Sequence, residues 1–303
     1  NIRASTRERV MNAINEMSYT RSSIARALAT SRTMRIGAII DNPGYFGPNS
    51  TLRALEAAAR ENGYAVSAFT AGDDEARRVD AGVIELVAQG VDALCVIAPR
   101  ASSLDLLRQQ PISVPTLVVK EEPDEQMHTV SVDQRAGTIA AMQHLIDLGH
   151  RTILHLAGPP DWFDARARTE AWRQSLQDAG LPVIEPVVGD WSSDSGYEYA
   201  KNLQLGDATA IFAANDQMAL GLLHGFAERG IRVPDDVSVV GFDDGPDARH
   251  YLPPLTTVRQ DFVQLGRLVI GELLTALEGD DTVVRELIQP ELQLRASTAA
   301  PRG

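Results

Sequence analysis

Carboxylate and amide side chains follow two apolar stretches of the chain. Asn215 and Asp216 come just after the apolar run 209–213, and Asp243 and Asp244 come directly after the run 237–242. In an open α/β sheet, polar side chains at the carboxyl ends of buried strands line the crevice where ligands bind. Because amides and carboxylates form directional hydrogen bonds, these residues predict a small-molecule site.

Other side chains at expected strand ends and helix starts extend this prediction. Arginine and asparagine offer donors, aspartate and asparagine offer acceptors, and an indole face packs against the apolar face of a sugar ring. Taken singly, Trp191 also fits a core position and Arg168 a solvated helix face. Taken together, the set favours a polyhydroxylated ligand. Its members are Tyr45, Phe46, Arg100, Lys120, Asp164, Arg168, Trp191, Asn215, Asp243, Gln260 and Phe262.

Catalytic chemistry receives little support from the sequence. The phosphate-loop, zinc-protease and nucleophile-elbow motifs are absent from the printed sequence. Adjacent Asp243 and Asp244 suggest glycoside hydrolysis, but neighbours on an extended segment point to opposite sides and cannot readily flank one bond. Cys95 is the single cysteine and lies in an apolar run, as a core residue does. We therefore expect a binding protein, not an enzyme, without cofactor or metal.

The elements that position these residues follow a repeated pattern of short apolar strands and amphipathic helices. Glycines close successive helices and are each followed by a strand, as in helix-to-strand turns. Repeated units of this kind predict parallel sheets covered by helices. Strands are expected near 35–40, 65–69, 93–98, 115–119, 152–157, 187–189, 209–213 and 237–242, followed by a helix over 262–277 and an extended stretch over 283–294.

The amino-terminal segment differs from this body in charge and pattern. Residues 1–35 carry seven arginines against two glutamates, whereas the whole chain of 303 residues has a net charge of −13. A capping box at 5–8 begins one predicted helix, and a second short helix fits 22–29. A basic arm on an acidic body predicts that this end meets a polyanion.

The amino-acid sequence of these segments resembles that of the lactose/galactose repressor family of transcription regulators and is close to its lactose-repressor branch. The resemblance rests on the run from Ala213 to Gly221, on 239–244, and on 6–19 followed by 24–29. It implies an α/β fold of two Rossmann-like lobes with parallel sheets, of the periplasmic-binding-protein type I. A short helical remnant of a helix-turn-helix headpiece precedes the lobes, and a three-strand hinge at 132–133, 260–262 and 290–291 joins them.

The same resemblance divides the chain into three units. Residues 1–33 form the end of the headpiece and a hinge helix. The amino-terminal effector-binding lobe comprises 34–132 with 261–290, and the carboxyl-terminal lobe comprises 133–260 with 291–303. The resemblance also implies that the candidate residues above bind the effector, with Trp191 stacking on it and Arg168, Asn215 and Asp243 gripping its hydroxyls.

The resemblance further implies partners. Paired hinge helices enter the minor groove of operator DNA, where Leu28 wedges between base steps, flanked by Ile24 and Arg26. A homodimer is expected through Gln217, Leu220 and Tyr251. Ser18, Arg21 and Ser22 depart from the family pattern, and the two helices that read the major groove do not precede Asn1, so we expect a piece of a longer, cytoplasmic repressor.

Alternatives remain open at this point. A periplasmic sugar-binding protein of a transporter shares the two-lobed fold, but it needs a secretion signal and not the segment 6–28. A purine effector is suggested by Tyr45 and Phe46. Lys120 stands where the family commonly has aspartate; if it points into the cleft it selects an acidic ligand, and if it pairs with Glu121, Glu122 or a carboxylate across the cleft, a neutral sugar is preferred.

Overall fold

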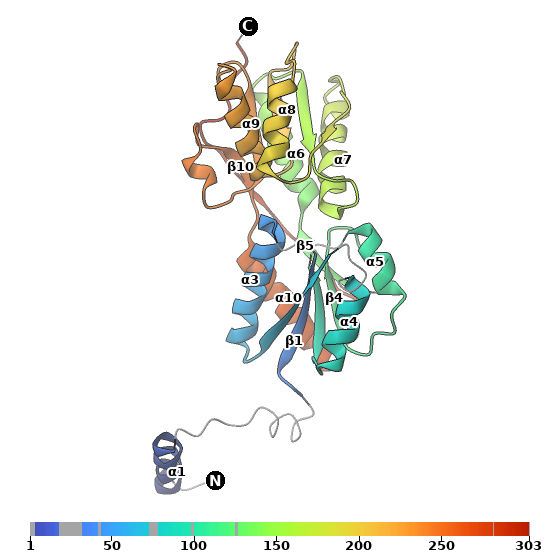
Figure 1. Ribbon diagram of the computed structural model, residues 1–303, viewed down its shortest axis with the longest axis vertical. Helices are drawn as coiled ribbons and strands as arrows, with labels where there is room; N and C mark the ends of the chain where they lie inside the picture. The colour runs from blue at the N-terminus through green and yellow to red at the C-terminus, as the bar shows by residue number, and fades with distance from the viewer. Residues whose placement is uncertain are drawn as a thin grey trace.

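The computed structural model describes residues 4–17, 32–41, 44–72, 78–97, 100–124, 127–280 and 282–302. Within them the chain forms two lobes, each a largely parallel β-sheet between helices, stacked end to end (Figure 1). This confirms the predicted fold class. Among the described residues, no helix has the length and apolar character needed to span a membrane.

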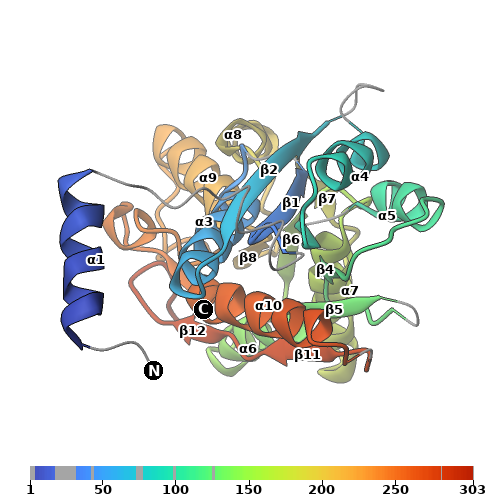
Figure 2. The ribbon, with the colours of Figure 1, turned by 90° about the horizontal axis from the view of Figure 1, so that it is seen from below.

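The first lobe contains a six-stranded parallel sheet in the order β11-β5-β4-β3-β1-β2. Helices α4 and α5 cover one face, and α3 and α10 cover the other (Figure 2). Side chains alternate between these faces, so Cys95 is buried toward α3 and α10 while its neighbours Leu94 and Val96 are buried toward α4 and α5. The elements are β1 (Arg35–Asp41), α3 (Phe46–Glu61), β2 (Ala65–Ala71), α4 (Val79–Ala88), β3 (Ala93–Ile97), α5 (Ala101–Arg108), β4 (Thr116–Val119), β5 (His128–Val132), α10 (Phe262–Leu277) and β11 (Arg285–Ile288).

The second lobe repeats the arrangement, with a sheet in the order β12-β10-β9-β8-β6-β7. Only the pairing of β12 with β10 is antiparallel among the described strands. Phe212 and Phe242 bury their rings toward α6 and α7, and Ile211 and Val239 face α8 and α9. The elements are α6 (Gln134–Asp147), β6 (Ile153–Ala157), α7 (Phe163–Asp178), β7 (Val187–Val188), α8 (Ser193–Asn202), β8 (Ala210–Ala213), α9 (Asp216–Glu228), β9 (Ser238–Asp243), η2 (Ala248–His250), β10 (Thr256–Arg259) and β12 (Glu291–Gln293).

The chain passes between the lobes at three places. β5 of the first sheet runs directly into α6 of the second lobe, β10 of the second sheet leads to α10 of the first lobe, and β11 is followed by β12 in the other sheet. The predicted three-strand hinge is therefore confirmed. Side chains next to these crossings lie between the lobes.

The strands predicted from apolar runs are all present, and the extended stretch near 283–294 resolves into β11 and β12. Two strands, β5 and β10, are additional, and both form inner strands of their sheets. The helix predicted from the capping box is α1 (Ala4–Glu16). The predicted hinge helix over 22–29, with Ile24, Arg26 and Leu28, lies outside the described residues.

Candidate functional site

A cavity lies between the lobes, at the carboxyl ends of the strands in both sheets. We call it the inner chamber. Its volume is about 60 Å³. On the scale where one water needs about 10–15 Å³, this is room for a few waters. Its walls come from both lobes: Tyr45, Phe46, Gly47, Pro48, Thr51, Ile97, Val119, Ser131, Val132, Gln134, Trp162, Asp164, Arg168, Trp191, Asn215, Asp243, Gln260, Phe262 and Leu265.

Arg168 is the centre of the polar wall. It lies on the buried face of α7 and is 3% exposed. Its Nε and Nη2 donate to Oε1 of Gln134 at 3.0 and 2.8 Å, and its Nη1 donates to the carbonyl of Ala214. Its Nη2 also lies 3.9 Å from Oδ2 of Asp164 and 3.8 Å from Oδ1 of Asp243. A buried guanidinium is thus held by neutral acceptors and faces two carboxylates.

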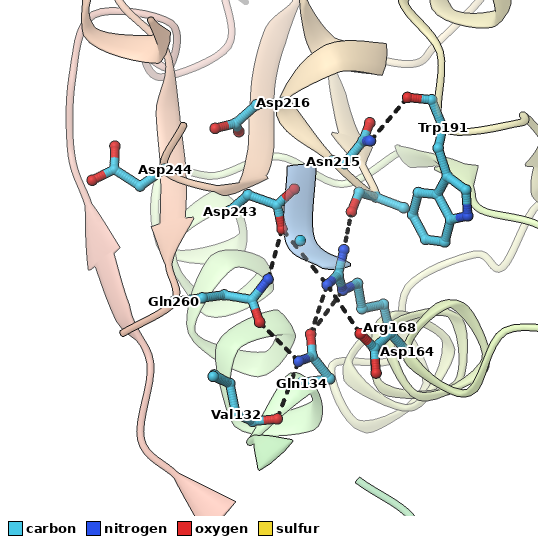
Figure 3. Close-up of polar contacts among 12 residues, drawn as sticks. Val132, Gln134, Asp164, Arg168, Trp191, Asn215, Asp216, Asp243, Asp244 and Gln260 are labelled. Atoms are coloured by element: carbon cyan, nitrogen blue, oxygen red, sulfur yellow. Dashed lines mark hydrogen bonds and ion pairs between the residues drawn. The ribbon is translucent and has the colours of Figure 1, made fainter. Parts of the chain in front are cut away.

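Two glutamines complete a ring of hydrogen bonds that the ion pair between this arginine and Asp243 closes (Figure 3). Gln134 donates to Oε1 of Gln260 at 3.0 Å and to the carbonyl of Val132 at 3.1 Å. Gln260 in turn donates to Oδ1 of Asp243 at 2.7 Å. Gln134 and Gln260 stand beside two of the three crossings, so the ring joins the chamber to the hinge.

Asn215 is positioned by a helix start. It caps α9, because its Oδ1 accepts from the backbone N–H of Met218 at 2.8 Å. Its Nδ2 donates to the carbonyl of Trp191 at 3.0 Å. Trp191 has a φ of +72°, in the left-handed region that is unusual for a bulky residue. The bond from Asn215 therefore ties this backbone, and its indole, to the end of β8.

Both carboxylates that line the chamber have pKa values raised above their ordinary value. Burial raises the pKa of Asp243 to about 6, against the opposing effects of Arg168 and Gln260. Burial also raises the pKa of Asp164, which Arg168 partly offsets. Just outside the chamber, burial and the nearby Asp164 and Asp133 raise the pKa of Glu121 to about 7. Desolvated carboxylates of this kind are typical of binding sites.

Aromatic rings form the apolar wall. Tyr45 and Trp162 meet edge to face at 5.7 Å between ring centroids, and Trp162 and Trp191 do so at 6.0 Å. The rings of Phe46 and Phe262 also meet edge to face, with 5.8 Å between their centroids. A Cβ at position 158 would approach the Trp191 indole to 2.2 Å, so Gly158 leaves the space that the indole fills.

Most of the effector residues expected from the sequence are brought together here, but two are not. Lys120 is 2% exposed, and its Nζ lies 3.2 Å from Oδ2 of Asp124 and 4.9 Å from the ring centroid of Phe163. Its neighbour Val119 lines the chamber, and successive side chains of an extended segment point to opposite sides. Lys120 therefore points away from the chamber and pairs with Asp124, which is not among the partners expected from the sequence.

Arg100 is the second expected residue outside the chamber lining. Its Nε lies 2.8 Å from Oδ2 of Asp41, the last residue of β1. Its backbone forms an isolated antiparallel bridge with Trp162 of the other lobe. Arg100 thus belongs to the contact between the lobes and not to the chamber wall.

Sequence reasoning missed several lining residues, of which Gln134 matters most. It is 1% exposed and binds Arg168 and Gln260 at once. The signal was available, because Gln134 directly follows the predicted linker at 132–133. Thr51 and Ser131 were also missed; each is a small, buried polar side chain and resembles an ordinary core residue.

The adjacent carboxylates after β9 diverge, as the sequence argument expected (Figure 3). Asp243 faces Arg168 and Gln260, whereas Asp244 lies 2.7 Å from Nε of Arg259 and 2.5 Å from Nη2 of Arg295. Within the described ranges, no group of three or more His, Cys, Asp or Glu side chains is arranged to hold a metal ion.

The remaining expected residues concern a dimer. Gln217 and Leu220 lie on α9, and Leu220 is 38% exposed. Tyr251 is partly buried and packs against the core beneath α8 and α9. Beside them, a hollow of about 400 Å³ is lined by α9 and by Leu252, which is 88% exposed.

Comparisons with known proteins agree with this architecture. A family model described as a periplasmic binding protein-like domain matches residues 142–298. The lactose operon repressor of Escherichia coli (strain K12) is 32% identical over 305 residues, covering 99% of this chain and 84% of that protein. The HTH-type transcriptional repressor PurR of Haemophilus influenzae is 32% identical over 304 residues, covering 96% of this chain and 89% of that protein.

A solved structure gives the same result in three dimensions. The crystal structure of the lac repressor dimer bound to operator and the anti-inducer ONPF is similar with a TM-score of 0.85 at 30% identity, covering 93% of this chain and 100% of that chain. The likeness therefore includes both lobes.

Proposed function

The chain belongs to the lactose/galactose repressor family of ligand-responsive transcription regulators, and from this premise we propose that the inner chamber is its effector site and that the effector is a saccharide. The observation that carries the proposal is the ring formed by Arg168, Gln134, Gln260 and Asp243 between the lobes. A ligand held there contacts both lobes and both glutamines at the crossings.

The chemistry of the walls favours a saccharide. A sugar hydroxyl donates one hydrogen bond and accepts others, and the chamber offers carboxylate acceptors, amides and a guanidinium within one small volume. The faces of Tyr45, Phe46 and Trp191 match the apolar faces of a sugar ring. Because Lys120 pairs with Asp124 and does not line the chamber, it supplies no cation for an acidic ligand, and a neutral sugar suits the site better than a sugar acid.

Effector binding would act through the lobes. We propose that 34–132 with 261–290, and 133–260 with 291–303, move as two bodies, and that the effector binds their closed and open arrangements with different affinity. A coupling of about 1–3 kcal/mol is typical of such systems. Residues 1–33 would transmit the change to operator DNA, with Ile24, Arg26 and Leu28 contacting the minor groove.

A homodimer completes the proposal. Similarity to a repressor dimer bound to operator supports it, and the exposed Leu220 and Leu252 beside the hollow on α9 supply an apolar surface of the kind that interfaces cover. Gln217, Leu220 and Tyr251 are the proposed interface residues. Because a regulator of operator DNA acts in the cytoplasm, we propose that location. Because the relatives are regulators, we also propose that this chain binds its effector without catalysis.

A purine is the second candidate effector. The observation in its favour is the set of aromatic rings, since Phe46, Phe262 and Trp191 offer surfaces on which a planar base stacks. The saccharide is favoured because polar side chains face the chamber from both lobes. A purine carries its polar groups only at its edge and could meet fewer of these side chains.

A thermal-shift screen of the chain tests the assignment. Monosaccharides, disaccharides, hypoxanthine and guanine are added at rising concentration, and a ligand that binds the folded chain raises the unfolding temperature by mass action. We expect at least one saccharide to raise it for the unsubstituted chain but not for Asp243→Asn. Stabilisation by a purine alone would overturn the saccharide assignment.

A further inference from the structure

Asp216 is a buried carboxyl at the start of α9, next to the inner chamber but outside its lining. It directly follows Asn215, which does line the chamber. Its side chain is fully buried, with 0% exposure. Figure 3 places it beside Asp243 and Asp244, the two carboxylates that follow one another at the end of β9. A buried acid needs hydrogen-bond partners, because desolvation without them is costly.

Both oxygens of Asp216 accept hydrogen bonds from the segments that surround Asp243. Oδ2 accepts from the backbone N–H of Gly245 at 2.8 Å, and Oδ1 accepts from the hydroxyl of Thr257 at 2.5 Å. Thr257 lies on β10, the strand paired with β9, and its hydroxyl also accepts from the N–H of Asp244 at 3.4 Å. One carboxyl therefore ties the start of α9 to the turn after β9 and to the neighbouring strand.

The backbone of this turn has an unusual conformation. Asp243 has a φ of +112° and Asp244 a φ of +50°, in a region where residues with a Cβ are uncommon. Such residues persist only where their surroundings hold them, and they gather at ligand-binding sites. Asp243 is the chamber acid that accepts from Gln260 at 2.7 Å and faces Arg168. The direction of its side chain thus depends on the contacts that hold the turn.

The sheet leaves a space for the Asp216 carboxyl. A Cβ at position 241 of β9 would approach Oδ1 of Asp216 to 2.3 Å, so the glycine at this position is what lets the carboxyl lie against the strand. Gly241 is also the residue opposite Thr257 in the pairing of β9 with β10. The acid is therefore fitted into the packing of α9 against these two strands.

The surroundings of Asp216 favour its neutral form. Burial raises its pKa well above the ordinary range, and Asp243 and Asp244 raise it further, whereas the hydrogen bonds from Thr257 and Gly245 oppose this. Asparagine has the shape of the neutral acid: its Oδ1 can accept from the N–H of Gly245, and its Nδ2 can donate to the Thr257 hydroxyl. An asparagine at this position therefore keeps both contacts and removes the charge.

We propose that Asp216 is a positioning residue of the effector site. Through Gly245 and Thr257 it holds the turn after β9, and that turn directs the carboxylate of Asp243 toward Arg168. The inference rests on the proposed function, because Asp243 is the residue that grips the effector there. Asp216 lies outside the chamber and acts on the effector only through Asp243.

A double-mutant cycle on stability tests the proposal without a ligand. At about pH 8, Asp243→Asn stabilises the chain because it removes a buried charge, and urea denaturation measures this gain. In an Asp216→Ala background we expect the gain to fall below about half, because the released turn lets Asp243 reach solvent. Thr257→Val, which removes one of the two contacts, should reduce the gain in the same direction. Asp216→Asn keeps both contacts and should preserve the gain.

Asp80→Ala is the matched control, since Asp80 also lies in the first turn of a helix, but on α4 of the other lobe, where it pairs with Arg78. It should leave the gain from Asp243→Asn unchanged. An undiminished gain in Asp216→Ala overturns the proposal, and so does the absence of any gain in the unsubstituted background. A gain lost equally in Asp216→Asn also overturns it, because the coupling would then be one of charge and not of position.

Calorimetric titration with glucose, galactose and lactose connects this result to the effector site. A sugar that binds the unsubstituted chain should bind Asp216→Ala at least about ten-fold more weakly, and Asp216→Asn within about two-fold of the unsubstituted chain. Unchanged affinity in Asp216→Ala, or an equal loss in both variants, contradicts the positioning role. If none of the three sugars binds, the result counts against the saccharide assignment and not against Asp216, whose role the stability comparison decides.

Discussion

Ser102 of the first lobe and Asp161 of the second are hydrogen-bonded across the cleft. The Ser102 hydroxyl donates to Oδ2 of Asp161 at 2.6 Å, its backbone N–H lies 3.3 Å from Oδ1, and the N–H of Ala101 donates to the Asp161 carbonyl at 2.8 Å. Because α5 begins at Ala101, a carboxylate from one lobe caps a helix of the other. This contact joins the two lobes directly.

Removing this cap should favour the open arrangement. Loss of a capping side chain typically costs about 0.5–2 kcal/mol, and in Asp161→Ala that cost falls on the closed state alone. We expect a larger radius of gyration by small-angle X-ray scattering and an effector affinity reduced about three- to ten-fold. Asp178→Ala, at the exposed end of α7, is the control; an equal change in both variants would contradict the role of Asp161.

The position of the Trp191 indole depends on a glycine. In Gly158→Ala the new methyl would approach the indole to 2.2 Å, so the ring must move and lose its place in the chamber wall. We expect effector affinity to fall at least about ten-fold, because crowding in a packed site costs roughly 1–3 kcal/mol. Gly271→Ala is the control, since nothing lies within 4 Å of its Cβ position. Retained affinity in Gly158→Ala would show that the indole does not contact the effector.

Asp243 should make stability depend on pH. Its pKa in the folded chain is about 6, above the ordinary value of 3.8, so the folded state binds this proton more tightly and ionisation above about pH 6 costs folding free energy. Asp243→Asn removes that cost. At about pH 8 the variant should exceed the unsubstituted chain in free energy of unfolding by roughly 1–3 kcal/mol.

That difference should shrink as the pH falls through about 6 toward 4, because the carboxyl is then protonated in the folded state and the unfolded state gives up its own ionisation only as the pH approaches 3.8. Urea denaturation of both proteins across this range measures it. A difference that is independent of pH, or a variant that is less stable at about pH 8, would contradict the account of Asp243.

Gln134 should be required for the ring around Arg168. Gln134→Leu leaves Nε and Nη2 of Arg168, and Oε1 of Gln260, without their present partner. Each buried polar group left in this way costs about 1–3 kcal/mol, so urea denaturation should show a clear loss of stability. Gln143→Leu, on the exposed face of the same helix, should change stability by less than about 0.5 kcal/mol. Comparable losses of stability in Gln134→Leu and Gln143→Leu would show that the hydrogen bonds of Gln134 around Arg168 do not account for the effect.

The strands were predictable where apolar residues formed an uninterrupted run, and they were missed where polar residues interrupted it. β1, β3 and β9 are continuous buried segments, as parallel strands with both faces covered must be. β5 and β10 were missed because Thr129, Ser131, Thr256 and Thr257 occupy buried positions in short strands. Their polar side chains conceal the apolar pattern on which such predictions depend.

The site was predictable to the extent that strand ends converge. Asn215 and Asp243 were found by this rule, since both follow strands of one sheet. The rule fails for Lys120 because it locates a backbone position and not the direction of the side chain. It also gave no sign that Phe163 of the second lobe is buried in the core beneath α4 and α5 of the first, because contact across two lobes depends on their relative placement.

Calorimetric titration of one saccharide into three proteins tests the central claim most directly. The saccharide that gives the largest thermal shift is titrated into the unsubstituted chain, Asn215→Ala and Asp243→Asn, after circular dichroism has shown that all three are folded. We predict one binding site in the unsubstituted chain and an affinity at least about ten-fold lower in each variant, as expected when a buried hydrogen-bonding partner is lost. Unchanged affinity in both variants would contradict the assignment of the inner chamber as the effector site.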